Sequence, residues 1–257
     1  MMGKGIEPAR PSAYLRTMKF ETPLIPGKLI KRYKRFLTDV ELDDGSVVTA
    51  HCANSGSMLS VNEPGAPVWL SPANNPKRKL QYTWELIQIG EPPNAAMVGI
   101  NTQHPNRIVF DAIAAGQIAE LTGYEAQKRE VKYGKNSRID MLLSGGGKPD
   151  CYVEVKNTTM RRDLSSGAPA EFPDAVTARG AKHLDELADM VDQGHRAVMF
   201  YLIQRDDADS FTVAGDIDPT YAERLHSAMK RGVEVIAYHC RVTPEEVEIA
   251  GPAEIRV

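Results

Sequence analysis

Cysteine is scarce in this chain: three occur among 257 residues, at positions 52, 151 and 240, far apart and without any Cys-x-x-Cys pair. That spacing favours neither a disulfide framework nor a zinc ribbon, so we expect a reducing compartment and a cytoplasmic protein. Long hydrophobic runs are missing as well. The longest covers residues 197–203, far short of the roughly 20 residues that cross a bilayer as a helix. We therefore expect no membrane partner.

Glycine-rich phosphate loops are also absent from the sequence. Neither a Gly-x-Gly-x-x-Gly nor a P-loop pattern follows a strand-like run, so no nucleotide cofactor is expected. Charge, in contrast, is unevenly distributed. Residues 1–90 carry 12 Lys and Arg against 8 Asp and Glu, whereas residues 91–257 carry 19 against 26. The first part therefore suits a polyanionic partner, and the second suits a site rich in carboxylates.

Turn-forming residues divide the chain into three parts. Residues 1–17 hold Gly, Pro, Lys and Arg without periodicity, which predicts a flexible N-terminal tail. Residues 18–100 contain about five short strand-like runs, a pattern typical of a small all-β barrel of the oligonucleotide-binding (OB) type. Residues 101–257 alternate strand-like and helical patterns after a hairpin, which predicts an α/β domain with a mixed sheet.

The first predicted barrel strand, residues 28–36, is strongly basic and carries two aromatic rings. Proteins bind nucleic-acid strands with such mixtures, in which cations track the phosphates and rings stack on bases. A basic edge strand that only prevents sheet-to-sheet aggregation has the same composition, and this alternative stays open. The candidates for binding nucleic acid are Lys31, Arg32, Tyr33, Lys34 and Arg35.

Two helices are expected to flank the hairpin of the second domain. Apolar residues recur at near-helical spacing between residues 108 and 121, so the first helix would carry Glu120 near its C-terminal end. The second helix is expected to start with Asp174 as its N-cap and to run to about residue 193. Its first half carries His183, which is either a functional acid or ligand, or an ordinary packing residue.

The hairpin itself, residues 137–156, is the most informative segment, because it places charge within apolar strands. Two strand-like runs flank a turn of three glycines, and symmetric closure about the third glycine sets Asp140 opposite Glu154. Side chains alternate along a strand, so both carboxylates are expected on one face, and Ile139 and Met141 on the other. One face is therefore predicted to be apolar and the other charged.

Two carboxylates that face each other across a hairpin repel, so they need a compensating charge. Mg²⁺, or Mn²⁺ in its place, would supply it by taking Asp140 and Glu154 as oxygen ligands, with Lys156 beside the scissile phosphate. The alternative is a ladder of salt bridges among Arg138, Asp140, Glu154 and Lys156 on a solvated face. Spacing alone leaves both interpretations open.

An Asp on one strand and Glu-x-Lys on the next resembles the core of the PD-(D/E)xK nucleases. That motif is loosely spaced, but several other segments are more specific. In their order along the chain they resemble the bacterial sugar fermentation stimulation protein A family over residues 18–240. These segments include residues 54–58 (Asn-Ser-Gly-Ser-Met), 82–86 (Tyr-Thr-Trp-Glu-Leu), 105–107 (Pro-Asn-Arg), 130–134 (Glu-Val-Lys-Tyr-Gly), 172–177 (Phe-Pro-Asp-Ala-Val-Thr) and 194–197 (Gly-His-Arg-Ala).

The resemblance implies an OB domain joined to a PD-(D/E)xK nuclease-like domain, with DNA as the partner and little sequence specificity. It also implies a regulatory role in sugar (maltose) metabolism. Carried over by position, Asp140, Glu154 and Lys156 match the nuclease triad, the first two as metal ligands, and Glu120 matches an auxiliary carboxylate. Ile139 stands where the motif has Pro, a change of little consequence because the Asp supplies the ligand.

Two functions therefore compete. One is a DNA-binding protein whose nuclease-like domain is mainly a scaffold, and the other is a Mg²⁺-dependent nuclease that hydrolyses phosphodiester bonds in DNA or RNA. In the nuclease, Glu120 or His183 would assist a triad that is intact in this chain. Sensing of a small molecule is a third possibility, for which no specific ligand is indicated. The sequence leaves the oligomeric state open, a dimer included.

Overall fold

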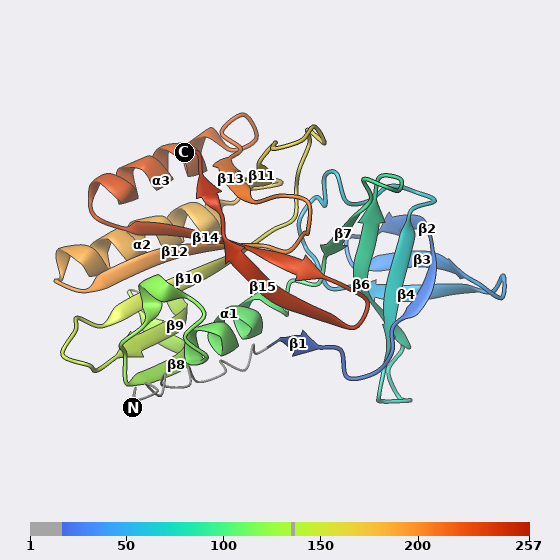
Figure 1. The fold of residues 1–257 in the computed structure, drawn as a ribbon, viewed down its shortest axis with the longest axis horizontal. Coiled ribbons are helices and arrows are strands. Elements are labelled where there is room, and N and C mark those ends of the chain that lie inside the picture. The colour runs from blue at the N-terminus through green and yellow to red at the C-terminus, as the bar shows by residue number, and fades with distance from the viewer. Residues whose placement is uncertain (1–16, 135–136) are drawn as a thin grey trace, which may run out of the picture.

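A computed structural model describes residues 17–134 and 137–257. It consists of a β-barrel and a larger α/β unit that lie side by side (Figure 1). The tail expected over residues 1–17 lies outside the described residues, except for Thr17. None of the helices in the described ranges is long and apolar enough to cross a membrane.

Five strands close the N-terminal barrel, which confirms the predicted OB architecture. The strand order of the six-stranded sheet is β4-β3-β2-β5-β6-β7; a parallel pairing of β4 with β6 closes the ring of five, and β7 extends it beyond β6. Alternating residues of these strands fill a core around the fully buried Trp84. The strands are β2 (Ile25–Tyr33), β3 (Leu37–Leu42), β4 (Val47–Cys52), β5 (Pro67–Pro72), β6 (Tyr82–Ile89) and β7 (Ala96–Gly99).

The basic segment of the barrel is a strand followed by a turn rather than one strand over residues 28–36. β2 ends at Tyr33, and Lys34 and Arg35 have φ angles of 46° and 64°. Two successive residues with positive φ are typical of the tight turns that match the twist of a β-hairpin. The side chains of Lys34 and Arg35 therefore project from the β2–β3 turn and are exposed to solvent.

The second unit is built on a seven-stranded mixed sheet, as predicted. Its central strands β10, β12 and β14 are parallel, and the hairpin strands β8 and β9 are antiparallel to their neighbours. In spatial order the strands are β1 (Met18–Lys19), β15 (Glu246–Pro252), β14 (Glu234–Val242), β12 (Arg196–Ile203), β10 (Cys151–Thr158), β9 (Ser137–Ser144) and β8 (Ala126–Tyr133).

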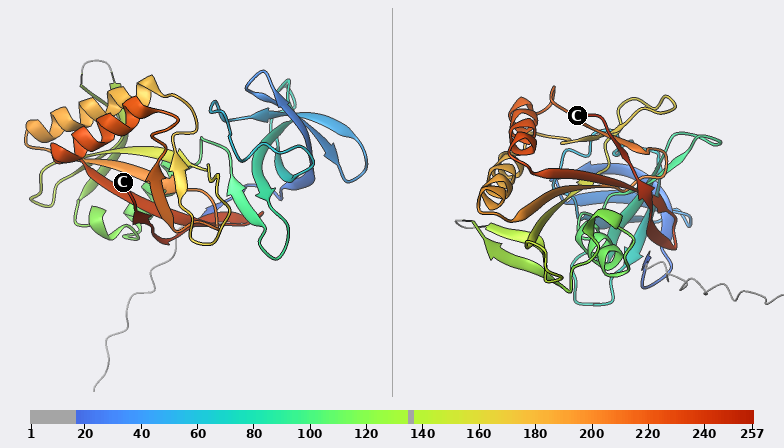
Figure 2. Two further views of the ribbon diagram at one scale, coloured as in Figure 1. Left: turned by 90° about the horizontal axis from the view of Figure 1, so that it is seen from above. Right: turned by 60° about the vertical axis from the view of Figure 1, so that its left-hand side comes forward.

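Helices cover both faces of this sheet. Helices α2 (Ala178–Asp192) and α3 (Pro219–Lys230) lie together along one face, as Figure 2 shows, and share one apolar core with it. Helix α1 (Pro105–Ala114) packs on the opposite face in a second core. A small parallel sheet of β11 (Ala170–Phe172), β13 (Ser210–Val213) and β16 (Glu254–Ile255) lies beside them. Both faces of the central strands are therefore buried.

Three predicted boundaries are wrong. The first helix ends at Ala114 because Gly116, with a φ of 71°, turns the chain, and a separate 3₁₀ turn, η1 (Ala119–Leu121), follows. Helix α2 starts at Ala178 with Thr177, not Asp174, as its N-cap: the Thr177 hydroxyl accepts the hydrogen bond of the Gly180 amide.

The third boundary concerns the start of the barrel domain, expected at residue 18. Strand β1 pairs with β15, so Met18 lies opposite Val247 in the large sheet and not in the barrel. A two-residue strand carries too weak a pattern to be assigned to a partner more than 200 residues away. The barrel proper begins with β2.

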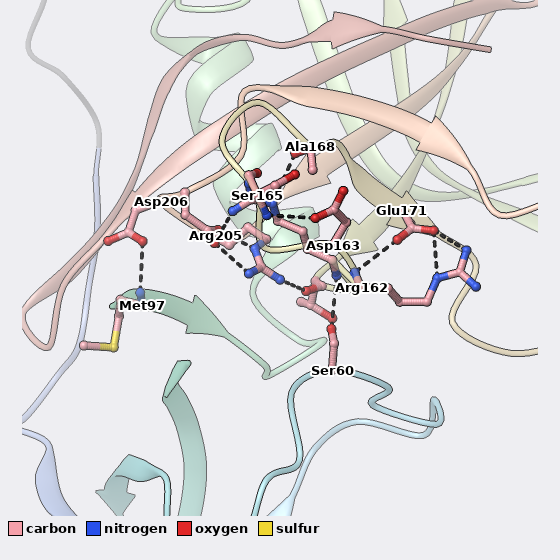
Figure 3. Close-up of polar contacts among 12 residues, drawn as sticks. Ser60, Met97, Arg162, Asp163, Ser165, Ala168, Glu171, Arg205 and Asp206 are labelled. Carbon is pink, nitrogen blue, oxygen red and sulfur yellow. Dashed lines mark hydrogen bonds and ion pairs between the residues drawn. The ribbon is translucent and has the colours of Figure 1, made fainter. Parts of the chain in front are cut away.

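Backbone hydrogen bonds join the barrel to the α/β unit. The Gly99 amide donates to the Gln204 carbonyl at 2.8 Å, just beyond the end of β12. Figure 3 shows two further contacts: the Met97 amide donates to Asp206 at 2.9 Å, and Ser60 accepts from the Arg161 amide at 3.1 Å. Strand β7 is thus bound directly to the segment that follows the central strand of the other unit.

Candidate active site

The acidic hairpin closes in the predicted register but opens at its charged end. Met141 pairs with Val153 and Leu143 with Cys151, as symmetric closure requires, and the ladder stops there. At the next position the Asp140 carboxylate accepts a hydrogen bond from the Val155 amide at 2.8 Å. The Asp140 side chain thereby replaces a main-chain carbonyl of β9 as the acceptor for the Val155 amide. Strands β9 and β10 are therefore separated at the position of the two carboxylates.

The separation also changes the faces of the strands. Ile139 packs in the core under α2 and α3, whereas Met141 packs in the core under α1, so the prediction that they share a face is wrong. Strict alternation fails because β9 is distorted around Asp140. The alternative of a solvated salt-bridge ladder is also wrong, because Glu154 is only 3% exposed and Arg138 donates to the Glu130 carbonyl instead.

Four of the predicted catalytic residues line one cleft of about 480 Å³ between the barrel and the α/β unit. Strands β9 and β10 supply the triad of Asp140, Glu154 and Lys156, and helix α2 supplies His183. Helix α1 adds Asn106 from its first turn. The hairpin and one helix from each face of the sheet therefore meet at this cleft.

Glu154 is held through one of its two carboxylate oxygens. Its Oε1 accepts from Lys156 Nζ at 2.7 Å and from His183 Nδ1. His183 Nε2 in turn accepts from the Arg179 guanidinium at 3.3 Å, so the ring hydrogen belongs on Nδ1. Glu154 Oε2 is buried and has no hydrogen-bond partner among residues 17–134 and 137–257. Among the described residues, Glu154 Oε2 is thus a buried oxygen at the cleft that lacks a hydrogen-bond donor.

The electrostatics of the two carboxylates differ. Burial, and then the charge of Glu154, raise the pKa of Asp140 to about 6, although the Val155 amide, the charge of Lys156 and Asn106 partly oppose this. Asn106 donates to Asp140 at 2.7 Å. Burial also acts to raise the pKa of Glu154, but Lys156 and His183 outweigh it and hold that pKa below its usual range. The negative charge of Asp140 is therefore only partly compensated.

A hard divalent cation fits this arrangement. Mg²⁺ is usually bound by one or two carboxylates, with water and substrate phosphate completing its shell. Asp140 and Glu154 provide such a pair, and the unpartnered oxygen of Glu154 and the raised pKa of Asp140 are what a missing positive charge leaves behind. In the described part of the chain no group of three or more His, Cys, Asp and Glu side chains is placed to hold a metal.

Glu120 does not join this cleft, contrary to its prediction as an auxiliary carboxylate. Its carboxylate accepts from the Tyr238 hydroxyl at 2.8 Å, and its backbone carbonyl accepts from Arg196 at the start of β12. The two triad residues on β10, Glu154 and Lys156, instead lie in the middle and the C-terminal half of that strand. The cause is the early end of helix α1, which moves Glu120 into a separate turn.

The five basic-strand residues differ in their contacts. Arg32 is committed to the fold, because its guanidinium donates to the backbone carbonyls of residues 35, 54, 56 and 57. Lys31 lies 3.7 Å from Asp39 in an exposed ion pair and 5.4 Å from the ring centroid of Tyr33. With Lys34 and Arg35 in the exposed turn, the surface available to a polyanion is smaller than the sequence suggested.

Three contributors to the cleft were not assigned a role from the sequence. Asn106 contacts Asp140, the loop of residues 54–56 forms part of the wall, and Asp174 faces that loop. Their signal was present in the motif segments at residues 54–58, 105–107 and 172–177. Nothing in the spacing showed that these distant segments meet.

Comparison with known proteins gives a consistent result. A family model described as the sugar fermentation stimulation protein RE domain matches residues 103–246, and one described as the SfsA N-terminal OB domain matches residues 30–100. A sugar fermentation stimulation protein homolog of Rhodospirillum rubrum is 58% identical over 234 residues, which cover 88% of this chain and 94% of the relative. A homolog of Paramagnetospirillum magneticum is 56% identical over 235 residues, which cover 91% of this chain and 96% of that relative.

A solved structure is similar over both units. SfsA of Pyrococcus furiosus, described in complex with Ca²⁺, matches with a TM-score of 0.81 at 25% sequence identity. The match covers 93% of this chain and 98% of that one. The pairing of a barrel with a mixed α/β sheet is therefore shared.

Proposed function

This chain belongs to the sugar fermentation stimulation protein family, and we propose that it is a divalent-metal-dependent nuclease that binds DNA with little sequence specificity. The observation that carries the proposal is the buried, unpartnered oxygen of Glu154 beside Asp140 at the cleft between the two units. A scaffold without catalysis gives no reason to keep a buried, unpartnered carboxylate oxygen, a second carboxylate with a raised pKa and a lysine at the same cleft.

Asp140 and Glu154 are the residues that would hold Mg²⁺ or Mn²⁺. When bound, such an ion activates water and stabilises charge on a phosphate. The Ca²⁺ complex described for the relative from Pyrococcus furiosus supports a divalent-cation site in this family. Calcium and magnesium both take oxygen ligands, which agrees with the donor pair in this chain.

The remaining residues orient the reactants. Lys156 uses one of its three donors on Glu154 and has two others for the attacking water or a phosphate oxygen. His183 is a positioning residue, since both of its ring nitrogens are engaged in holding Glu154 and meeting Arg179. In the proposed reaction a water oxygen bonds to phosphorus, the bond from phosphorus to the leaving sugar oxygen breaks, and that oxygen takes up a proton while the water loses one.

The barrel would supply affinity. Lys31, Lys34 and Arg35 present cations on the exposed end of the β2–β3 hairpin, and Tyr33 lies beside them. Phosphate contacts carry no direct sequence information, which accounts for binding of low specificity. A role in sugar metabolism stays a prediction of the family resemblance.

The test is a cleavage assay. Purified protein is incubated with labelled DNA and RNA oligonucleotides in Mg²⁺, Mn²⁺ or EDTA. Cleavage is expected with either metal and not in EDTA, and Asp140→Asn and Lys156→Ala are each expected to slow it by roughly a hundredfold or more.

Asp150→Asn is the matched control, because it removes a carboxylate from the turn of the same hairpin, outside the cleft. Its rate should equal that of the unchanged protein. Binding without cleavage in every metal would overturn the nuclease and leave a DNA-binding protein.

A further inference from the structure

The reactive groups lie at the bottom of the cleft and not on an open surface. Glu154 is almost completely buried, and the side chains of Lys156 and His183 are 15% and 5% exposed. A phosphodiester must therefore enter the cleft to reach them.

Both units of the protein supply walls of this cleft. The barrel contributes the loop of residues 54–56, between β4 and β5, and the α/β unit contributes residues 174–176, ahead of helix α2. The barrel is thus part of the reaction chamber as well as a source of affinity.

These two walls are tied to each other at Asp174. The Met58 amide donates to the Asp174 carboxylate at 2.8 Å, and the Ser57 hydroxyl donates to the Asp174 backbone carbonyl. Gly56 packs so closely that a Cβ atom there would lie 2.6 Å from the same carboxylate. The barrel loop itself is fixed from behind by Arg32, whose guanidinium donates to the carbonyls of residues 54, 56 and 57. The walls cannot separate without breaking these contacts.

The interface behind the walls restricts the cleft further. The hydrogen bonds from Gly99 to Gln204 and from Met97 to Asp206, together with the contact between Arg161 and Ser60, hold the barrel against the large sheet (Figure 3). Opening the cleft by a rotation of the two units would cost these bonds as well.

The walls limit which nucleic acid can reach the triad. The reacting groups lie below the rim of a cleft whose two walls are tied together, and in a duplex each backbone is held beside its partner strand. A single strand is narrower, and one of its nucleotides can enter while the rest of the strand leaves across the rim.

The rim carries the two kinds of group that a single strand uses. Val176 lines the cleft and is 75% exposed, which offers an apolar surface to an unstacked base. Arg179, one turn into the same segment, also lines the cleft and is exposed, which offers a cation to the adjoining phosphate. Paired bases are stacked inside a duplex and cannot make the first of these contacts.

We infer that the cleft accepts an unpaired, single-stranded segment of nucleic acid and excludes continuous duplex. This inference rests on the proposed nuclease function and names its substrate class. The barrel loop of residues 54–56 and the segment of residues 174–176 select that substrate, because their mutual contacts keep the two walls of the cleft close together.

The experiment compares one oligonucleotide sequence as a single strand, as a blunt duplex, and as a duplex with single-stranded overhangs, all in Mn²⁺. The single strand and the overhangs should be cut, and the blunt duplex should be cut roughly a hundredfold more slowly, because a base must first be unpaired. Equal or faster cleavage of the blunt duplex would overturn the inference and leave the nuclease standing. No cleavage of any oligonucleotide would overturn both.

A variant tests the wall directly. Ser55→Tyr places a large side chain at an exposed position of the barrel loop without touching the triad. It should slow cleavage of the single strand by roughly tenfold or more, with the thermal unfolding midpoint unchanged. Ser46→Tyr, on the exposed β3–β4 turn and outside the cleft, is the control and should cleave normally. Normal cleavage by a folded Ser55→Tyr protein would count against the inference.

Discussion

At the scale of single residues, Asp140 and Glu154 show how one hairpin gives two carboxylates different properties. Glu154 is buried and accepts hydrogen bonds from Lys156 and His183, whereas Asp140 is partly buried and accepts them from the Val155 amide and Asn106. Neutral donors compensate a buried charge less than a cation does. Asp140 therefore keeps a raised pKa, and a bound cation would lower it.

Metal binding should depend on pH through Asp140. Because its pKa in the metal-free protein is about 6, the carboxyl group is protonated below pH 6 and must lose that proton to become a ligand. The affinity for Mn²⁺ should be nearly constant above pH 7 and should fall by about tenfold for each pH unit below 6. Isothermal titration calorimetry from pH 5 to pH 8 measures this.

Asp140→Asn serves as the control for that titration. It should bind Mn²⁺ weakly at every pH, because an amide oxygen is a poorer ligand than a carboxylate. If the unchanged protein bound Mn²⁺ equally well at pH 5 and pH 7.5, Asp140 would not be a ligand.

The triad was predictable from the sequence, but its surroundings were only partly so. A two-residue period and a glycine turn were enough to set Asp140 opposite Glu154. The distortion at Asp140 could not be predicted from that pattern, because it arises from a side chain that bonds to the neighbouring strand. Glu120 was misplaced for a different reason: the apolar spacing continued past Gly116, and that spacing was given more weight than the glycine.

At the scale of elements, the β2–β3 hairpin and the β4–β5 loop form one unit through Arg32. The basic composition of its strand made Arg32 a candidate for binding nucleic acid, but composition says nothing about a loop that folds over the strand. Five guanidinium donors in a rigid fork can satisfy several carbonyls at once, which Lys cannot do. Arg32 therefore supports the cleft rather than a phosphate.

Arg32→Ala should destabilise the protein and loosen the cleft wall. Loss of charge-assisted hydrogen bonds to buried carbonyls should lower the free energy of unfolding by about 2 kcal/mol, and cleavage should slow. Lys34→Ala, on the adjoining turn, should leave the free energy of unfolding within about 0.5 kcal/mol and weaken nucleic-acid binding instead. Urea denaturation and fluorescence anisotropy separate the two effects; equal stability of both variants would contradict the assignment of Arg32.

At the scale of the whole molecule, the barrel and the α/β unit share a buried polar interface. Arg205 is completely buried and donates to both oxygens of Asp207 and to the Thr159 carbonyl. Arg161 donates to the same Asp207, and strand β7 binds the chain on either side of Arg205. Strand β7 therefore attaches the barrel beside a buried polar network of the α/β unit.

Arg205→Ala should cost about 3–5 kcal/mol, because it leaves buried acceptors without their partner. Differential scanning calorimetry should show one transition for the unchanged protein and two for the variant, as the barrel and the sheet unfold separately. Arg224→Ala, which removes an exposed ion pair with Asp185, should cost less than about 1 kcal/mol. A loss of similar size in the two variants would mean that the interface does not couple the units.

The domain order was predictable because each unit has its own period and turn pattern. The way the two units are joined was not predictable from the sequence. The contacts of β7 with residues 204–206 depend on backbone groups, which every residue carries, so no residue type indicates them. The short strand β1 was assigned to the wrong unit for the same reason.

Strand β1 has a consequence for the order in which the protein is made. The barrel strands pair only among residues 25–99, so the barrel can form soon after they leave the ribosome. Met18 and Lys19 leave earlier still, yet their partners, Val247 and Glu246, are synthesised more than 200 residues later. The earliest strand of the described chain is therefore among the last to find its place, because residues 246 and 247 must be synthesised before the large sheet gains this edge.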